Sequence, residues 1–157
     1  MRFILVDKIL EMTPGRTIRA VKTLSPAEEL FQDHFPGFPV VPGVLLTEMM
    51  AQAAGKCLFA EDPKRGRPML AQIKVASFRD WVRPGEEITL VGEIRSSRPQ
   101  FAAASCHAEV HGHLVCSAEL LFSFQAASNF AEGYRDEVLE RFRERAAGET
   151  TGNATNS

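Results

Sequence analysis

The chain has 157 residues, 45% of them apolar and 24% charged, which fits one globular domain with at most a short extension. Its 18 basic and 20 acidic residues give a formal net charge of −2, so no surface that binds nucleic acid through phosphate contacts is expected. The sequence shows no export signal, no apolar run of membrane-spanning length and three cysteines without framework spacing. We therefore expect a cytoplasmic chain with reduced thiols and no membrane span.

Residues 3–24 are expected to be extended, with a turn at residues 13–16 where proline and glycine interrupt the pattern. A helix is then predicted to start at Ser25, because serine is a favoured N-cap, Pro26 suits the first helical position and Glu28 completes a capping box. This helix must be short, since prolines disfavour helix in the segment that follows. The prolines of that stiff loop are Pro36, Pro39 and Pro42.

Residues 44–60 predict a helix of about five turns with apolar or small side chains at nearly every position. A helix that is apolar on all sides is a buried helix. It carries a polar stripe at spacing i, i+4 and i+8, formed by Glu48, Gln52 and Lys56. Within the same helix, Gly55 costs about 1 kcal/mol relative to alanine, which indicates a packing reason for the glycine.

Four later segments alternate between apolar and polar residues with a period of two, which predicts strands. They are residues 69–80, 87–95, 101–110 and 114–124. Between the last two, His111-Gly112 favours a hairpin turn, but a two-residue turn would place the apolar residues of the two strands on opposite faces. A three-residue loop with a left-handed Gly112, or partial burial of both faces, would resolve this conflict.

The C-terminal part carries an amphipathic pattern with a spacing of four residues, which predicts a short helix. Its apolar residues are Tyr134, Val138, Phe142 and Ala146. The expected fold class is therefore α+β, with a curved antiparallel sheet of five to six strands wrapped around one long central helix, plus a short C-terminal amphipathic helix. We predict a domain at residues 1–125, a helical extension at 126–147 and a disordered tail at 148–157.

Three groups around the start of the central helix suggest carbonyl chemistry. His34 lies on the proline-stiffened loop, where its position is fixed and it can act as a base. Gly43 lies at the start of the helix, where backbone N–H groups lack partners and can stabilise a carbonyl oxygen that gains negative charge. Glu48 lies on an apolar helix, where loss of hydration favours the neutral acid. Together they suit proton abstraction next to a carbonyl, with loss of a neighbouring hydroxyl.

The residues around these groups closely resemble a known family. His-Phe-Pro-Gly-x-Pro at residues 34–39, Pro-Gly-Val-Leu at 42–45 and Glu-x-x-Ala-Gln at 48–52 are similar to the signature of the FabZ-type 3-hydroxyacyl-[acyl carrier protein] dehydratases. The similarity extends from about Phe3 to about Phe124. It implies the hot-dog fold and makes residues 1–125 a hot-dog dehydratase domain.

The resemblance implies dehydration of a (3R)-3-hydroxyacyl thioester on acyl carrier protein to a trans-2-enoyl thioester, in fatty acid or related acyl-chain biosynthesis. His34 would remove the C2 proton, Glu48 of the partner subunit would protonate the departing hydroxyl, and the N–H of Gly43 would hold the thioester carbonyl. Gln52 would support the site, either by hydrogen bonding to Glu48 or by satisfying a buried backbone group. The resemblance also implies a homodimer joined through the sheet, commonly stacked as a trimer of dimers, and no metal or redox cofactor.

Two alternatives stay open at this point: a hot-dog acyl-thioesterase and a non-catalytic acyl-binding hot-dog subunit. The thioesterase is disfavoured, because no other residue would obviously activate water. The non-catalytic subunit rests on departures from the family pattern, namely Thr47 and Met49 beside Glu48 and the long tail; a further departure, Gln72 in place of a common glycine, could alter tunnel length or carrier-protein docking. The related isomerising dehydratases carry aspartate at the Glu48 position and cysteine at the Val44 position. Simple dehydration is therefore favoured over dehydration with isomerisation.

Two further clusters carry weaker hypotheses. His107, His111 and His113 lie near two cysteines, but their spacing matches no standard metal-ligand pattern, so no metal site is expected. Basic residues in the connector after the central helix and around the next turn would suit an acidic carrier protein, or would form a solvated face. They are Lys64, Arg65, Arg67, Arg79 and Arg83.

Overall fold

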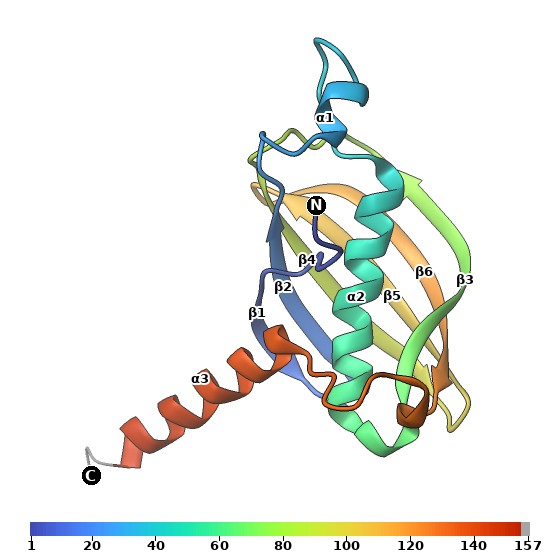
Figure 1. The fold of residues 1–157 in the computed structure, drawn as a ribbon, viewed down its shortest axis with the longest axis vertical. Helices are drawn as coiled ribbons and strands as arrows, with labels where there is room; N and C mark the ends of the chain where they lie inside the picture. Colours follow the sequence, from blue (N-terminus) through green and yellow to red (C-terminus); the bar gives the residue numbers. More distant parts are fainter. Residues whose placement is uncertain (155–157) are drawn as a thin grey trace.

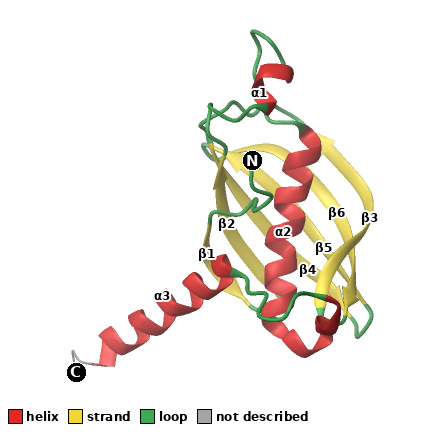
Figure 2. Cartoon of the chain, viewed as in Figure 1, coloured by secondary structure: helices red, strands yellow, loops and turns green. Residues whose placement is uncertain are grey.

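The computed structural model describes residues 1–154 and shows a curved antiparallel sheet wrapped around one long helix (Figure 1, Figure 2). Its strands are β1 (Lys8–Thr13), β2 (Thr17–Thr23), β3 (Arg67–Phe78), β4 (Glu87–Ser97), β5 (Phe101–Val110) and β6 (His113–Gln125). Its helices are α1 (Leu30–Asp33), α2 (Gly43–Glu61), α3 (Glu137–Ala154) and the 3₁₀ turns η1 (Pro63–Arg65) and η2 (Ala127–Asn129). The strand order is β1-β2-β4-β5-β6-β3, so β1 and β3 are the edges of the sheet. The expected α+β hot-dog fold is confirmed, with six strands.

The central helix α2 lies close to the sheet because the inner face of the sheet carries small residues. On β5, alternate side chains are small and buried: Ala102, Ala104, Cys106 and Ala108. On β4, a Cβ added at Gly92 would lie 3.7 Å from the Cβ of Ala54 on α2 and 3.1 Å from Ile18 Cγ2. This close packing fixes α2, and with it the polar residues that α2 carries.

The β5–β6 hairpin turns over two residues, His111 and Gly112, which both have left-handed backbone angles (φ 50° and 77°). The loop is not lengthened to three residues. The outer face of β5 is half-buried, as one expected solution allows, but that burial alone does not align the two strands. Instead, Val115 is an extra residue in β6, so that Cys106 lies opposite Ala118 and the buried residues of both strands share one face. Such a β-bulge restores the register that a plain two-residue turn would lose.

The predicted helix start at Ser25 is wrong. The Ser25 hydroxyl accepts a hydrogen bond from the Ala27 N–H at 3.1 Å, and its carbonyl accepts one from the Glu28 N–H at 3.1 Å. These residues form a turn, and α1 begins only at Leu30. The helix then ends directly before His34, where the proline-rich loop begins.

The C-terminal helix α3 continues to Ala154, past the end that the apolar pattern predicts near Ala146. Residues 148–154 of the predicted disordered tail are therefore helical in the structure, while residues 155–157 lie outside the described residues. The domain boundaries at residues 125 and 147 stay predictions. No helix within residues 1–154 has the length and hydropathy that a membrane span requires.

Candidate active site

The central helix α2 begins at Gly43, and its first backbone N–H groups have no partners within the helix. The preceding loop reaches this point through Val41, which is buried and whose N–H donates to the Val82 carbonyl at 2.8 Å. The Phe78 ring lies against Gly43, so that an added Cβ would be 2.9 Å from its Cε1 atom. Glycine therefore lets the aromatic ring lie over the start of the helix.

His34 is held through both its backbone and its side chain. Its carbonyl accepts a hydrogen bond from the Val40 N–H at 3.1 Å, and its Nδ1 lies 2.9 Å from the Val40 carbonyl oxygen. Because a carbonyl oxygen only accepts, Nδ1 carries the proton of the neutral ring and Nε2 keeps a lone pair. The Phe35 ring stacks on the imidazole with 4.1 Å between ring centroids. The half-buried imidazole is therefore fixed in orientation and presents a basic nitrogen.

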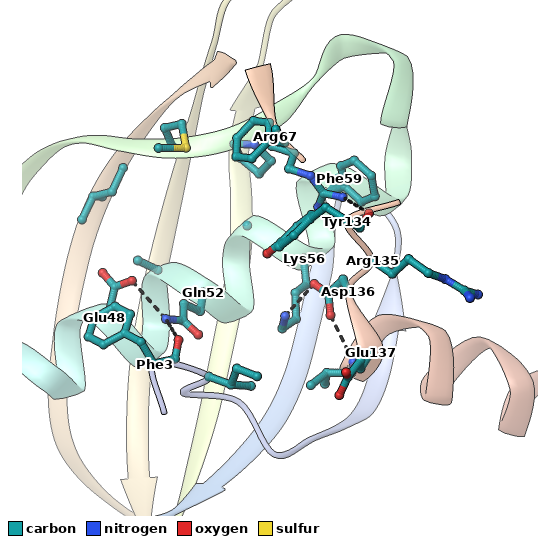
Figure 3. Close-up of a pocket in the computed structure, with 18 of the residues that line it drawn as sticks. Phe3, Glu48, Gln52, Lys56, Phe59, Arg67, Tyr134, Arg135, Asp136 and Glu137 are labelled. Carbon is teal, nitrogen blue, oxygen red and sulfur yellow. Dashed lines mark hydrogen bonds and ion pairs between the residues drawn. The ribbon is translucent and has the colours of Figure 1, made fainter. Parts of the chain in front are cut away.

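Glu48 and Gln52 lie one turn apart on α2 and are hydrogen bonded to each other (Figure 3). Gln52 Nε2 donates to Glu48 Oε1 at 3.1 Å and to the Phe3 carbonyl at 3.2 Å, and Gln52 Oε1 accepts from the Leu5 N–H at 2.8 Å. The N-terminal segment thus orients the amide so that its donor side meets Glu48. The bond to Glu48 and the bonds to backbone groups, which the sequence left as alternatives, occur together.

A cavity of about 560 Å³ opens beside the half-buried Glu48 (Figure 3). One wall is the face of α2 that carries Glu48 and Gln52, and the others come from the N-terminal segment, β3 and the segment before α3. The volume lies in the range of small-molecule sites. Among the described residues, His34 and Gly43 do not line this cavity. A single chain therefore brings Glu48 and Gln52 together but leaves His34 and Gly43 outside their cavity.

The cavity also contains an ion pair that was not predicted from the sequence. Lys56 Nζ lies 2.6 Å from Asp136 Oδ2, and both side chains are largely buried. Lys56 carried a signal, since it belongs to the polar stripe of the central helix. No sequence pattern pointed to Asp136, because its pairing with a residue 80 positions earlier depends on how the C-terminal segment folds back.

His107, Cys106 and Cys116 lie on β5 and β6, where the structure shows their surroundings. Within residues 1–154 no group of three or more potential ligands is placed to hold a metal ion, and His107 Nε2 instead lies 3.1 Å from a carboxylate oxygen of Glu109. Burial raises the pKa of Cys106 to about 12 and that of Cys116 to about 11. Both thiols therefore stay neutral and offer no nucleophile.

Arg65, one of the basic residues in the connector after the central helix, stabilises the fold. Arg65 Nη1 donates to Ser97 Oγ at 2.7 Å and to the Arg98 carbonyl at 3.2 Å, and its guanidinium lies 3.9 Å from the centroid of the Phe124 ring. Arg65 therefore joins η1 to β4 and β6 rather than facing solvent.

Comparison with known proteins places the chain in a family. A family model described as a FabA-like domain matches residues 1–119. The chain belongs to this family. The 3-hydroxyacyl-[acyl-carrier-protein] dehydratase FabZ of Ruminiclostridium cellulolyticum is 38% identical over 126 residues, which cover 80% of this chain and 89% of the relative. The FabZ of Levilactobacillus brevis is 39% identical over 125 residues, which cover 79% and 84%. The resemblance to FabZ-type dehydratases is confirmed.

Solved structures of low sequence identity share the fold. The dehydratase heterocomplex ApeI:P from Xenorhabdus doucetiae matches with a TM-score of 0.65 at 16% identity, over 80% of this chain and 86% of the matched chain. Zebra fish thioesterase superfamily member 2 matches with a TM-score of 0.59 at 8% identity, over 74% and 80%. These matches concern the fold alone, because the same architecture occurs in a dehydratase complex and in a thioesterase superfamily member.

Proposed function

We propose that the protein is a 3-hydroxyacyl-[acyl carrier protein] dehydratase, a hydro-lyase that converts (3R)-3-hydroxyacyl thioesters into trans-2-enoyl thioesters in fatty acid or related acyl-chain biosynthesis. The family match and the FabZ relatives support the reaction class. The observation that carries the residue roles is the 2.9 Å contact between His34 Nδ1 and the Val40 carbonyl oxygen. Its Nδ1 hydrogen bond to the Val40 carbonyl leaves Nε2 free to take a proton.

The reaction begins at C2 of the acyl chain. His34 Nε2 takes the C2 proton, and the electron pair of the broken C–H bond moves toward the thioester carbonyl. The carbonyl oxygen gains negative charge in this step. Because Gly43 begins α2, its N–H and the positive end of the α2 dipole would stabilise that charge.

Glu48 completes the reaction as the acid. Its carboxyl group gives a proton to the C3 hydroxyl as the C3–O bond breaks, the C2=C3 double bond forms and water leaves. Gln52 is a positioning residue, because its Nε2 holds Glu48 Oε1 and leaves the other oxygen to carry the proton. Proton exchange with water then returns His34 and Glu48 to their starting states. One proton is taken and one is given without any redox change, so the reaction needs no metal or redox cofactor.

Each active site in this proposal lies between two copies of the chain, with His34 of one protomer facing Glu48 of the partner subunit. Two features of the single chain support a homodimer. His34 lies outside the cavity that Glu48 lines. The edge strand β3 also exposes apolar side chains, including Met69, Ile73 and Val75 at 47%, 48% and 53%, and an unpaired apolar edge favours association. The resemblance to FabZ-type dehydratases extends the proposal to acyl carrier protein as the carrier of the substrate, to the cytoplasm as the place of action, and to the stacking of dimers as a trimer of dimers that is common in the family.

The proposal predicts that the purified protein produces enoyl absorbance from a 3-hydroxyacyl thioester. His34→Ala and Glu48→Gln each lower kcat by about 10²–10⁴-fold, because each removes a proton-transfer group. The matched control Glu93→Gln changes an exposed carboxyl group on β4 and keeps full activity. Release of free thiol without an enoyl product would identify a thioesterase, and acyl binding without turnover would identify a non-catalytic subunit. Either result, or inactivity at every chain length, contradicts the proposal.

A further inference from the structure

The segment that follows β6 lies beyond the family match, which ends at residue 119, and it crosses beside the C-terminal end of α2 before α3 begins (Figure 1). It covers one end of the cavity beside Glu48 (Figure 3). Its residues in the cavity wall are Phe130, Tyr134, Arg135, Asp136, Glu137 and Val138. In Figure 3, Glu48 lies at one end of the view and this segment at the other. The extension and the proposed catalytic acid therefore face the same space from opposite ends.

An ion pair and a helix cap hold the segment in this place. Lys56 Nζ on α2 donates to Asp136 Oδ2 at 2.6 Å, and only 11% and 17% of the two side chains are exposed. The other oxygen, Asp136 Oδ1, accepts from the N–H groups of Val138 and Leu139 at 3.1 and 3.0 Å and so caps α3. Val138 and Leu139 are themselves buried. The ion pair is therefore fixed from both sides.

Arg67 of β3 holds the aromatic part of the same wall. Its Nη2 donates to the Tyr134 carbonyl at 3.1 Å. Its guanidinium lies 4.0 Å from the centroid of the Tyr134 ring, 5.5 Å from that of Phe130 and 4.7 Å from that of Phe59. Cation–π attraction to three rings keeps Tyr134 and Phe130 at the end of the cavity.

The space between Glu48 and this wall suits an alkyl chain. The α2 face that lines it presents the small residues Ala51 and Gly55, and β3 adds the apolar side chains of Met69 and Leu70. Small residues on the helix leave room for a ligand, and the apolar side chains of the strand favour a hydrocarbon over water.

The ion pair limits how far an alkyl chain can reach. Glu48, Gln52 and Lys56 lie on successive turns of one helix face, so Lys56 lies about 12 Å along α2 from Glu48. The Lys56 and Asp136 side chains already satisfy each other and are largely dehydrated. A hydrocarbon chain that displaced them would leave buried charges without partners, which is costly.

We propose that Lys56, Asp136 and Tyr134 form a polar end wall that limits the length of the acyl chain that the enzyme accepts. This inference rests on the proposed dehydration, and it limits the substrates to 3-hydroxyacyl thioesters with short and medium acyl chains. An extended polypeptide advances about 3.6 Å over the three backbone bonds of a residue, so an extended acyl chain advances about 1.2 Å per bond. The ~12 Å between Glu48 and Lys56 therefore hold about ten carbon–carbon bonds beyond C3. A 3-hydroxyoctanoyl chain fits in this length, whereas a 3-hydroxyhexadecanoyl chain meets the wall.

The test compares kcat/KM for 3-hydroxybutyryl, 3-hydroxyoctanoyl, 3-hydroxydodecanoyl and 3-hydroxyhexadecanoyl thioesters. The variant K56M/D136N replaces the ion pair by an apolar and a neutral group, and asparagine retains the cap of α3. The second variant, Tyr134→Ala, leaves the ion pair in place. Because the Tyr134 residue is 55% exposed, its removal should not unfold the protein, so this variant tests the end wall even if K56M/D136N does not fold. The control R95M/E93Q neutralises an exposed ion pair of 2.9 Å on β4, away from the cavity.

The wild type is expected to use the octanoyl substrate well and the hexadecanoyl substrate poorly. K56M/D136N raises the hexadecanoyl-to-octanoyl ratio of kcat/KM by roughly tenfold, Tyr134→Ala shifts it in the same direction, and the control leaves it unchanged. An unchanged ratio in both cavity variants, with octanoyl dehydration intact, would overturn the end wall and leave the proposed function standing.

A binding measurement separates the two proposals further. Dissociation constants for a series of unreactive acyl-pantetheine amides report chain length without any turnover. Affinity that drops between octanoyl and hexadecanoyl in the wild type, and no longer drops in K56M/D136N, supports the end wall even in a protein without dehydratase activity. Equal dependence on chain length in both proteins would overturn it.

Discussion

At the scale of single residues, Gln52 links the stability of the fold to the chemistry of the site. Its Oε1 accepts from the N–H of Leu5, a fully buried residue, and its Nε2 donates to Glu48. The same side chain therefore secures the N-terminal segment against α2 and orients the proposed acid. A change at Gln52 acts on both properties, and two measurements can separate them.

The variant Gln52→Ala is expected to lower the free energy of unfolding by about 1–3 kcal/mol, because the buried Leu5 N–H loses its acceptor. Urea denaturation measures this loss. We also expect kcat to fall while KM stays nearly constant, since Glu48 loses the group that orients it. The control Gln100→Ala, at an exposed turn, changes neither quantity. A stability loss without any fall in kcat would show that Gln52 does not position the acid.

The sequence allowed His34, Gly43 and Glu48 to be named because their spacing forms a motif. It did not reveal the acceptor for His34 Nδ1, since the Val40 carbonyl is a backbone group that any residue could supply. It did not reveal Asp136 either, because a long-range pair has no periodic signature. Short-range motifs identify reactive side chains, whereas the hydrogen bonds that orient them depend on the folded chain.

At the scale of secondary structure, Gly55 shows that α2 serves as a cavity wall as well as a core helix. A Cβ added at this position would meet only Pro68 Cγ, at the ordinary contact distance of 3.5 Å. Packing therefore does not require glycine here, although the sequence pattern suggested a packing reason. The position of Gly55 in the cavity wall offers a different explanation, namely space for a bound molecule.

We expect Gly55→Ala to raise the free energy of unfolding by about 1 kcal/mol, because alanine restricts the unfolded chain and fits the helix. The midpoint of urea denaturation should rise at an unchanged m value. The matched change Gly92→Ala in β4 should instead destabilise the protein, since its Cβ would lie 3.1 Å from Ile18 Cγ2. A destabilised Gly55→Ala would show that packing against Pro68 does require the glycine.

The type and order of the main elements followed from periodicity, but their irregularities did not. Alternation predicted β5 and β6, and the conflict between a two-residue turn and the apolar faces signalled an irregularity, but the pattern did not show that the extra residue is Val115. The serine, proline and glutamate of an ideal capping box formed a turn at residues 25–28, and α1 begins only at Leu30. Local preferences predict where elements lie, while tertiary packing decides their ends.

At the scale of the whole molecule, the proposed site is incomplete in one chain. Glu48 and Gln52 share a cavity, and His34 lies outside it. The edge strand β3 exposes apolar side chains that a second copy of the sheet could cover. A two-fold dimer would supply each cavity with the histidine of the other protomer and would create two equivalent sites.

This arrangement predicts that two inactive variants restore activity when they are combined. His34→Ala and Glu48→Gln are mixed, unfolded and refolded together, so that half of the dimers contain one chain of each kind. In such a dimer one site has lost both groups and the other has kept both, and about a quarter of wild-type activity should return, since half of the dimers carry one intact site of two. Enoyl absorbance measures the recovery, and each variant refolded alone serves as the control. A mixture that stays as inactive as its components would place His34 and Glu48 of the same chain in one site, and the shared dimeric site would have to be abandoned.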